Sequence, residues 1–233
     1  MDAELFPRSR TEIAPGAVHL PDWLTSERQG ELLEACRDWA RPPAGLRTVR
    51  TPGGGTMTSR QVCLGWHWYP YGYAATVVDG DGAPVKKLPA WLAELGRLAV
   101  RDTFGDAADT AGAPAPAPAP APSYDYDYDI ALINFYDADA RMGMHRDSDE
   151  QSDAPVVSLS LGDTCVFRFG NTGSRGRPYT DVELRSGDLF VFGGASRLAY
   201  HGVPRVHAGT APPELGLTGR LNVTLRVSGL GAV

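Results

Sequence analysis

Two side chains that can bind a metal ion lie close together in the segment MGMHRDSDE, residues 142–150. In an extended backbone, residues i and i+2 point to the same face, so His145 and Asp147 can approach one ion from one side. A single His-x-Asp pair also occurs by chance on protein surfaces. The metal-binding interpretation therefore needs a third ligand from elsewhere in the chain.

His201 is the candidate for that third ligand. It is one of five histidines and lies in LAYHG, an apolar predicted strand on the far side of the strand-rich region. Two histidines and one carboxylate on one face make up the facial triad of non-haem Fe(II) oxygenases, which leaves positions open for a co-substrate and dioxygen. The residue types at positions 145, 147 and 201 are those of such a triad.

The segment RLNVTLR, residues 220–226, alternates strictly between polar and apolar side chains. One face carries Leu221, Val223 and Leu225, and the other carries Arg220, Asn222, Thr224 and Arg226. If the polar face looks into the protein, its two arginines need anionic partners, because an unpaired buried charge costs several kcal/mol. A small dicarboxylate with a charge at each end meets that need. An edge strand that turns its arginines to solvent is the alternative.

A further predicted strand, 124–136, ends shortly before the His-x-Asp segment. Asn134 and Tyr136 share one face at this end, where their neighbours are apolar. Buried Asn and Tyr side chains are expected to form hydrogen bonds, and a bound acid is a candidate partner.

The elements that would position these groups are helical in the N-terminal part and extended in the C-terminal part. A helix is predicted at 25–40, where Ser26 and Gln29 have the spacing of a capping box. A second helix is predicted at 89–101, with a buried side formed by Leu92, Leu95, Leu98 and Ala99. Short strands are predicted at 124–136, 155–161, 164–169, 182–184, 188–192, 198–203 and 220–228. Short strands at this spacing favour a sandwich or jelly roll, and the Ala-Pro repeat at 111–122 is interpreted as a spacer.

Composition narrows the class of protein. The chain of 233 residues allows one large domain or two small ones, and its 27 glycines and 19 prolines argue against a helical bundle. We find no membrane-spanning run and no secretory signal. Three separated cysteines are interpreted as reduced thiols, which favours a cytoplasmic location. The net charge of −6 disfavours a non-specific nucleic-acid coat but does not exclude an enzyme with a small basic rim.

Taken together, the motifs resemble those of the AlkB family of Fe(II)- and 2-oxoglutarate-dependent dioxygenases. The resemblance covers nearly the whole chain apart from the Ala-Pro repeat. Its motifs are T-P-G-G-x-T-M (51–57), L-G-W (64–66), L-I-N-x-Y (132–136), H-x-D-x-D-E (145–150), S-L-S-L-G (158–162), F-x-F-G (167–170), G-D (187–188), G-G-x-S-R-L-x-Y-H-G (193–202) and R-x-N-x-T-x-R (220–226).

The resemblance implies an α+β fold with a double-stranded β-helix (jelly-roll) core, N-terminal helices and a substrate lid. The expected single domain, 1–233, has an N-terminal cover (1–49), a nucleotide-recognition lid (50–83), the Ala-Pro insertion (111–122) and a catalytic core (123–229). The implied activity is oxidative dealkylation of N-alkylated bases in DNA or RNA, such as 1-methyladenine and 3-methylcytosine. The reaction would be coupled to decarboxylation of 2-oxoglutarate, with Fe(II) as cofactor and O₂ consumed. Alkylated DNA or RNA is the expected partner, and the protein is expected to be a monomer without a stable protein partner.

The resemblance also assigns roles to residues. The implied iron ligands are His145, Asp147 and His201. The distal carboxylate of 2-oxoglutarate would be bound by Arg220, Asn222 and Tyr136. The carboxylate next to its keto group would lie beside Arg226, with Asn134 nearby.

For the substrate, the resemblance implies that Asp149 reaches the target base. The lid would be formed by Trp66, Tyr73, Thr51 and Met57. The loop 171–178 offers Arg175 or Arg177 as a substrate contact, and we favour Arg175. Gly55 stands where some relatives carry an aromatic residue, which predicts looser lid contacts.

Two further readings of the sequence stay open. A 2-oxoglutarate-dependent oxygenase could act on a protein side chain or small molecule, for which the acidic charge is the only support. A non-catalytic or hydrolytic zinc-binding jelly roll lacks an H-E-x-x-H motif and would leave the paired arginines unused. His67 and His207 have no assigned role and are expected on the surface or in loops.

Overall fold

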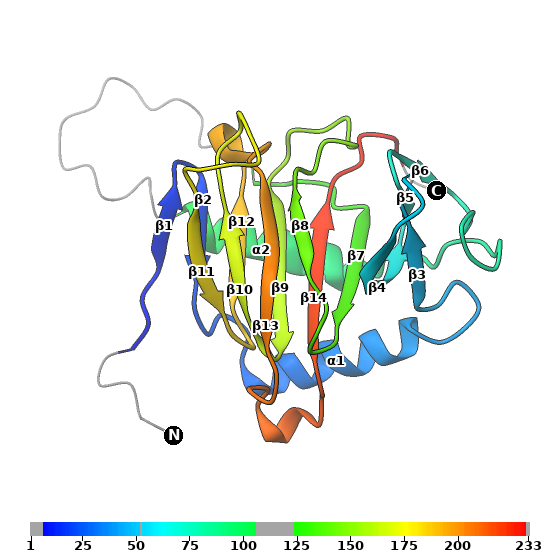
Figure 1. Ribbon diagram of the computed structural model, residues 1–233, viewed down its shortest axis with the longest axis horizontal. Helices are drawn as coiled ribbons and strands as arrows, with labels where there is room; N and C mark the ends of the chain where they lie inside the picture. The colour runs from blue at the N-terminus through cyan, green and yellow to red at the C-terminus, as the bar shows by residue number, and fades with distance from the viewer. Residues whose placement is uncertain (1–6, 52, 106–123, 232–233) are drawn as a thin grey trace.

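The computed structural model describes residues 7–51, 53–105 and 124–231, so the predicted Ala-Pro insertion lies outside the described residues. Two antiparallel sheets form the core (Figure 1). In spatial order, the larger sheet consists of β1 (Thr11–Ala14), β2 (Ala17–Leu20), β12 (Leu189–Phe192), β9 (Val156–Gly162), β14 (Arg220–Arg226), β7 (Ile130–Tyr136), β4 (Thr56–Leu64) and β3 (Arg47–Arg50). The smaller sheet consists of β11 (Thr180–Leu184), β10 (Thr164–Phe169), β13 (His201–His207) and β8 (Met142–His145).

Two helices cover the larger sheet on the side away from the smaller one (Figure 1). They are α1 (Ser26–Trp39) and α2 (Ala90–Phe104), and their leucines form one apolar cluster with the outward-facing residues of β9 and β14. A second cluster, rich in phenylalanine, fills the space between the two sheets. The short elements are the hairpin of β5 (His67–Tyr69) and β6 (Gly72–Ala74) and the 3-10 turns η2 (Gly194–Ser196) and η3 (Pro213–Leu215).

Both predicted helices are present, with small differences. The N-cap of α1 is Thr25 rather than Ser26, because the Thr25 side chain accepts a hydrogen bond from the Arg28 amide at 3.3 Å. In α2 the expected burial of Leu98 is wrong. Its side chain is exposed because it falls outside the stripe that contains Leu92 and Leu95.

The N-terminal part contains more strand than the sequence predicted. We expected helix and irregular loop there, but β1 to β4 all join the larger sheet. The strand β4 lies inside the predicted lid (50–83) and pairs with β7, with Gln61 opposite Asn134. It was missed because its buried residues include Ser59 and Gln61, which hide the apolar alternation.

The predicted C-terminal strands exist with shifted ends. The strand β7 begins at Ile130 rather than at 124, and β13 runs from His201 to His207 rather than from 198 to 203. The short strand β8 was not predicted. The three cysteines are free and buried, in agreement with the expected reduced thiols. None of the described helices is long and apolar enough to cross a membrane.

Candidate metal centre and substrate cavities

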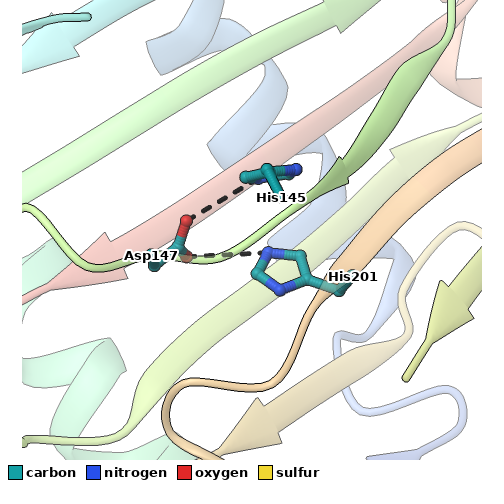
Figure 2. Close-up of side chains that lie close together, drawn as sticks. All are labelled: His145, Asp147 and His201. Atoms are coloured by element: carbon teal, nitrogen blue, oxygen red, sulfur yellow. Dashed lines mark ion pairs between the residues drawn. The ribbon is translucent and has the colours of Figure 1, made fainter. Parts of the chain in front are cut away.

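Pairing between β8 and β13 brings the candidate metal ligands together. His145 and His201 are direct partners across the two strands, and their ring centroids are 4.5 Å apart. Asp147 follows β8, and its two carboxylate oxygens lie 3.7 Å from His145 Nε2 and 3.7 Å from His201 Nε2 (Figure 2). One ligand atom from each residue lies within 4.8 Å of the others. The three side chains can therefore bind one ion from one side.

Backbone contacts orient both imidazole rings for this role. Nδ1 of His145 lies 3.0 Å from the Gly143 carbonyl, and Nδ1 of His201 lies 3.0 Å from the Ala199 carbonyl. A carbonyl only accepts hydrogen bonds, so each Nδ1 carries the proton and each Nε2 presents a lone pair. This arrangement is typical of histidines that ligate a metal.

The protonation states also suit a cation. Burial, with a contribution from His145, lowers the pKa of His201 to about 4, so its ring is neutral at pH 7. Burial alone would raise the pKa of Asp147, but the guanidinium of Arg226 and the two histidines hold it at about 2. Asp147 Oδ2 is buried, and none of the described residues forms a hydrogen bond with it. A buried carboxylate oxygen needs such a partner, and a metal ion between the three side chains provides one.

Arg220 is a buried cation that forms no ion pair with any of the described carboxylates. The residue is 1% exposed, and its Nη2 donates to Ser160 Oγ at 3.0 Å. Its Nε and Nη1 are buried and have no hydrogen-bond partner within the described part of the chain. Arg220 lines a small inner cavity of about 40 Å³ that is also lined by the three metal-ligand candidates. The predicted inward face of β14 is thus correct, and the site fits a carboxylate of a small acid.

The polar groups around this inner cavity are already partly engaged. The side-chain amide of Asn222 donates through Nδ2 to Ser158 Oγ at 2.7 Å. Its Oδ1 accepts a hydrogen bond from the Thr224 hydroxyl at 2.7 Å. Asn134 accepts from Gln61 at 3.1 Å. Burial raises the pKa of Tyr136, whose hydroxyl therefore stays a neutral donor. All four predicted polar neighbours of the acid line the cavity: Asn134, Tyr136, Asn222 and Arg226.

Arg226 links the metal centre to a carboxylate that we did not predict as a site residue. Its guanidinium lies 2.6 Å from Asp147 Oδ1 and 2.9 Å from Glu150 Oε1. Glu150 also pairs with Arg197 at 3.0 Å and accepts a hydrogen bond from the Tyr73 hydroxyl. Glu150 was present in the H-x-D-x-D-E motif, but nothing in the sequence indicated which arginines it would meet.

A larger outer cavity of about 490 Å³ opens next to the metal-ligand candidates. This is the size of pockets that hold a small organic molecule. Four of the six predicted substrate residues line it: Thr51, Met57, Asp149 and Arg175.

The other two predicted substrate residues, Trp66 and Tyr73, are not among the lining residues. Trp66 donates its indole N–H to the Gly231 carbonyl at 2.9 Å, and the Tyr73 hydroxyl is held by Glu150. The aromatic side chains at the wall are Trp68, Tyr71 and Tyr200. Trp68 donates to Asp149 Oδ2 at 2.8 Å, so it holds the carboxylate predicted to reach the base. The segment 66–73 is rich in aromatic residues, but its composition does not indicate which of them faces the cavity.

The expectation that His67 lies at the surface or in a loop is wrong. The residue is in β5 with an exposed fraction of 0%, and its Nε2 lies 2.7 Å from Asp79. Arg47 joins the same carboxylate at 2.7 Å and donates to the Trp68 carbonyl at 2.6 Å. The cluster of Arg47, His67 and Asp79 anchors the β5–β6 hairpin, and the Arg47 hydrogen bond fixes the backbone at Trp68.

Comparisons with known proteins agree with this geometry. The model of the 2OG-Fe(II) oxygenase superfamily matches residues 16–226. The chain is 36% identical to the alpha-ketoglutarate-dependent dioxygenase AlkB of Escherichia coli K12, over 93% of this chain and 92% of that protein. The chain belongs to the AlkB family of this superfamily.

Other relatives match the AlkB-family chain over most of its length. The solved structure of OsALKBH1 is similar with a TM-score of 0.80 and 32% identity, covering 93% of this chain and all of that one. The match confirms the predicted jelly-roll core. The Arabidopsis thaliana protein named DNA N(6)-methyladenine demethylase ALKBH1D is 31% identical over 92% of this chain. The chain spans about half of that protein's length.

Proposed function

We propose that this AlkB-family protein removes alkyl groups oxidatively from N-alkylated bases in DNA or RNA, such as 1-methyladenine and 3-methylcytosine. The observation that carries the proposal is the buried guanidinium of Arg220, two of whose nitrogen atoms have no hydrogen-bond partner among the described residues, and which lines the same inner cavity as His145, Asp147 and His201. A cation site and a carboxylate site thus lie next to each other. The outer cavity adjoins both and has room for a base.

The roles of the site residues follow from this arrangement. His145, Asp147 and His201 would hold Fe(II), which together with 2-oxoglutarate and O₂ supplies the oxidising chemistry. Arg220 would bind the distal carboxylate, aided by Asn222 and Tyr136. Arg226 and Asn134 lie where the inner cavity meets the outer one, and they suit the carboxylate next to the keto group.

The outer cavity would hold and orient the base. Asp149, fixed by the Trp68 indole, can accept a hydrogen bond from an exocyclic amino group. Thr51, Met57 and Arg175 complete the wall. A base extruded from its strand is read in this way, by stacking and by hydrogen bonds to its edge.

The overall reaction balances with these components. One oxygen atom of O₂ enters succinate as 2-oxoglutarate loses CO₂, and the other enters the N-alkyl carbon as a hydroxyl group. The hydroxylated group leaves the base nitrogen as an aldehyde, which is formaldehyde for a methyl group. The protein's contribution is to hold the acid, orient the base and limit the access of water.

The names of the relatives support a nucleic-acid substrate. They include a DNA N(6)-methyladenine demethylase in Arabidopsis thaliana and a tRNA demethylase, abh1, in Schizosaccharomyces pombe. Direct-reversal repair of alkylation damage is the proposed biological role. The cytoplasmic location and the monomeric state stay predictions from the sequence.

The test is a panel of N-methylated and etheno bases in DNA and RNA oligonucleotides, incubated with the purified protein, Fe(II), 2-oxoglutarate and O₂. We expect mass loss of the alkyl group and one aldehyde per succinate, and His145→Ala should show neither. Consumption of 2-oxoglutarate without dealkylation of any oligonucleotide would refute the proposal. It would favour the alternative oxygenase acting on a protein or small molecule.

A further inference from the structure

A closed ring of charged side chains holds Asp147 from two directions. Arg226 Nη2 lies 2.6 Å from the Asp147 Oδ1 atom, and Arg226 Nη1 lies 2.9 Å from Glu150 Oε1. The other oxygen of Glu150 lies 3.0 Å from Arg197 Nη2. Arg197 Nη1 then donates to the backbone carbonyl of Asp147 at 2.7 Å. The ring therefore starts at the side chain of Asp147 and returns to its backbone.

Glu150 is the member of this ring that has no role in the proposed reaction. Its side chain has an exposed fraction of 0%, and it is not among the lining residues of either cavity. Burial alone would raise the pKa of Glu150, but Arg226 and the other donors hold it below its usual value, so the carboxylate is charged at pH 7. The Tyr73 hydroxyl, from β6, donates a further hydrogen bond to it. A buried charge with this many partners is well placed to fix its neighbours.

Glu150 divides the guanidinium of Arg226 between two carboxylates. Arg226 reaches each carboxylate through one terminal nitrogen, and its Nε is buried with no hydrogen-bond partner in the described ranges. Guanidinium and carboxylate groups frequently pair through two parallel hydrogen bonds. An Arg226 that is released from Glu150 can present a second nitrogen to Asp147 Oδ2. That oxygen lies 3.7 Å from His201 Nε2 and is the one available to a metal ion.

We propose that Glu150 is a positioning residue of the metal centre. It retains one half of the Arg226 guanidinium, and Asp147 Oδ2 thereby stays free for the ion. Arg197 complements this role by fixing the backbone of Asp147. The inference rests on the metal centre of the proposed function, and it gives Glu150 an effect through Arg226 without any contact to the metal, the acid or the base.

Two simpler roles for Glu150 predict different measurements. Its negative charge could attract the cation directly, or its ion pairs could only stabilise the fold. A double-mutant cycle with Arg226 separates these roles from positioning, because residues that act through one another have non-additive effects. If Glu150 acts by restraining Arg226, its replacement has no further effect once the guanidinium is absent. A direct attraction of the cation persists in both backgrounds.

The experiment is anaerobic calorimetric titration of the metal-free protein with Fe(II), without 2-oxoglutarate. Glu150→Gln keeps the shape of the side chain and removes its charge. It should raise the Kd for Fe(II) by about 10- to 100-fold, the usual effect of losing a group that orients a metal ligand. In the Arg226→Gln background the same substitution should change the Kd by less than about twofold. Glu150→Asp keeps the charge but is too short to span both arginines, so its Kd should lie between those of the wild type and Glu150→Gln.

The matched control is Asp188→Asn. Asp188 is also a buried carboxylate in ion pairs, at 2.7 Å from Arg8 and 2.9 Å from His19, and it is not among the lining residues of either cavity. The control should lower Tm and leave the Kd for Fe(II) at the wild-type value. A loss of fold stability alone is thereby distinguished from a loss of metal affinity.

The inference is overturned by an equal effect of Glu150→Gln in the two backgrounds, by an unchanged Kd, or by a similar rise of the Kd in Asp188→Asn. If Glu150→Gln does not fold, Glu150→Asp in the same two backgrounds decides the question. A wild-type protein that binds no Fe(II) would refute the proposed function together with this inference. A wild-type protein that binds Fe(II), with additive effects of the two substitutions, would refute only the role of Glu150.

Discussion

Replacing Arg220 by methionine should move protein stability and co-substrate affinity in opposite directions. The guanidinium is buried and donates one hydrogen bond to Ser160, while its other two nitrogen atoms meet no partner in the residues that the structure describes. Without the acid, such a group is a cost to the folded state. Replacing buried charged groups with apolar side chains of similar volume has stabilised proteins by about 1–4 kcal/mol. For a chain of this size, 1 kcal/mol corresponds to about 2–4 °C in Tm.

When 2-oxoglutarate is bound, the substitution Arg220→Met is expected to be unfavourable instead of stabilising. The acid's distal carboxylate would enter the inner cavity without its partner, and truncating one member of a buried charge pair costs about 2–5 kcal/mol. The Kd for 2-oxoglutarate should therefore rise by about 30-fold or more. Wild-type protein should gain Tm as the acid is added, whereas Arg220→Met should start higher and gain little.

Thermal unfolding with and without the acid, together with calorimetric titration under anaerobic Fe(II), measures both effects. Ser160→Ala is the matched control, because it removes the hydrogen bond to Arg220 and leaves the charge. It should change the Kd by less than Arg220→Met does. An Arg220→Met protein that binds 2-oxoglutarate with unchanged affinity would refute the reasoning, as would a large loss of Tm at full affinity.

Three further predictions concern the metal centre and the outer cavity. His145→Ala should bind less than one Fe(II) per chain and lose turnover, as measured by metal analysis of dialysed protein, whereas His207→Ala should bind Fe(II) like the wild type. His201 has a folded-state pKa of about 4, below the unfolded value near 6.5, so the unfolded state binds the proton first as the pH falls. Metal-free protein should therefore lose about 3 kcal/mol of unfolding free energy between pH 6.5 and pH 4 through this group, and urea titrations of His201→Leu should lack that part of the loss. Trp68→Leu should raise KM for a methylated oligonucleotide by about 5- to 150-fold, since stacking of one base contributes about 1–3 kcal/mol, and Trp66→Leu should have the smaller effect. Equal effects of the two tryptophans on KM would contradict the placement of Trp68 at the cavity wall.

Sequence patterns predicted the centre of the site better than its periphery. The alternation in 220–226 is strict because β14 lies between β7 and β9, with one face in the helix-covered core and the other on the cavity. His145 and Asp147 were recognisable by their spacing, because a strand end imposes it locally. These features depend on one short segment each.

The features that were missed depend on contacts between distant segments. The segment 66–73 is rich in aromatic residues, but only its packing on Cys63, Ile130 and Leu132 decides which ring reaches the cavity. The polar residues of β4 conceal a central strand because Gln61 is buried against Asn134. The residues next to His67 in the sequence did not indicate that its side chain would be buried in contact with Asp79.

The ion pair between Arg226 and Asp147 restricts how the carboxylate can coordinate. The guanidinium lies 2.6 Å from one carboxylate oxygen, and the other oxygen has no hydrogen-bond partner in the described ranges of the chain. Asp147 is thereby prepared as a monodentate ligand beside two imidazole nitrogens. Calcium favours six to eight oxygen ligands and often binds both oxygens of a carboxylate. We therefore expect this site to bind calcium weakly. Arg226, which as a cation would not itself be a metal ligand, would thus disfavour calcium at this site.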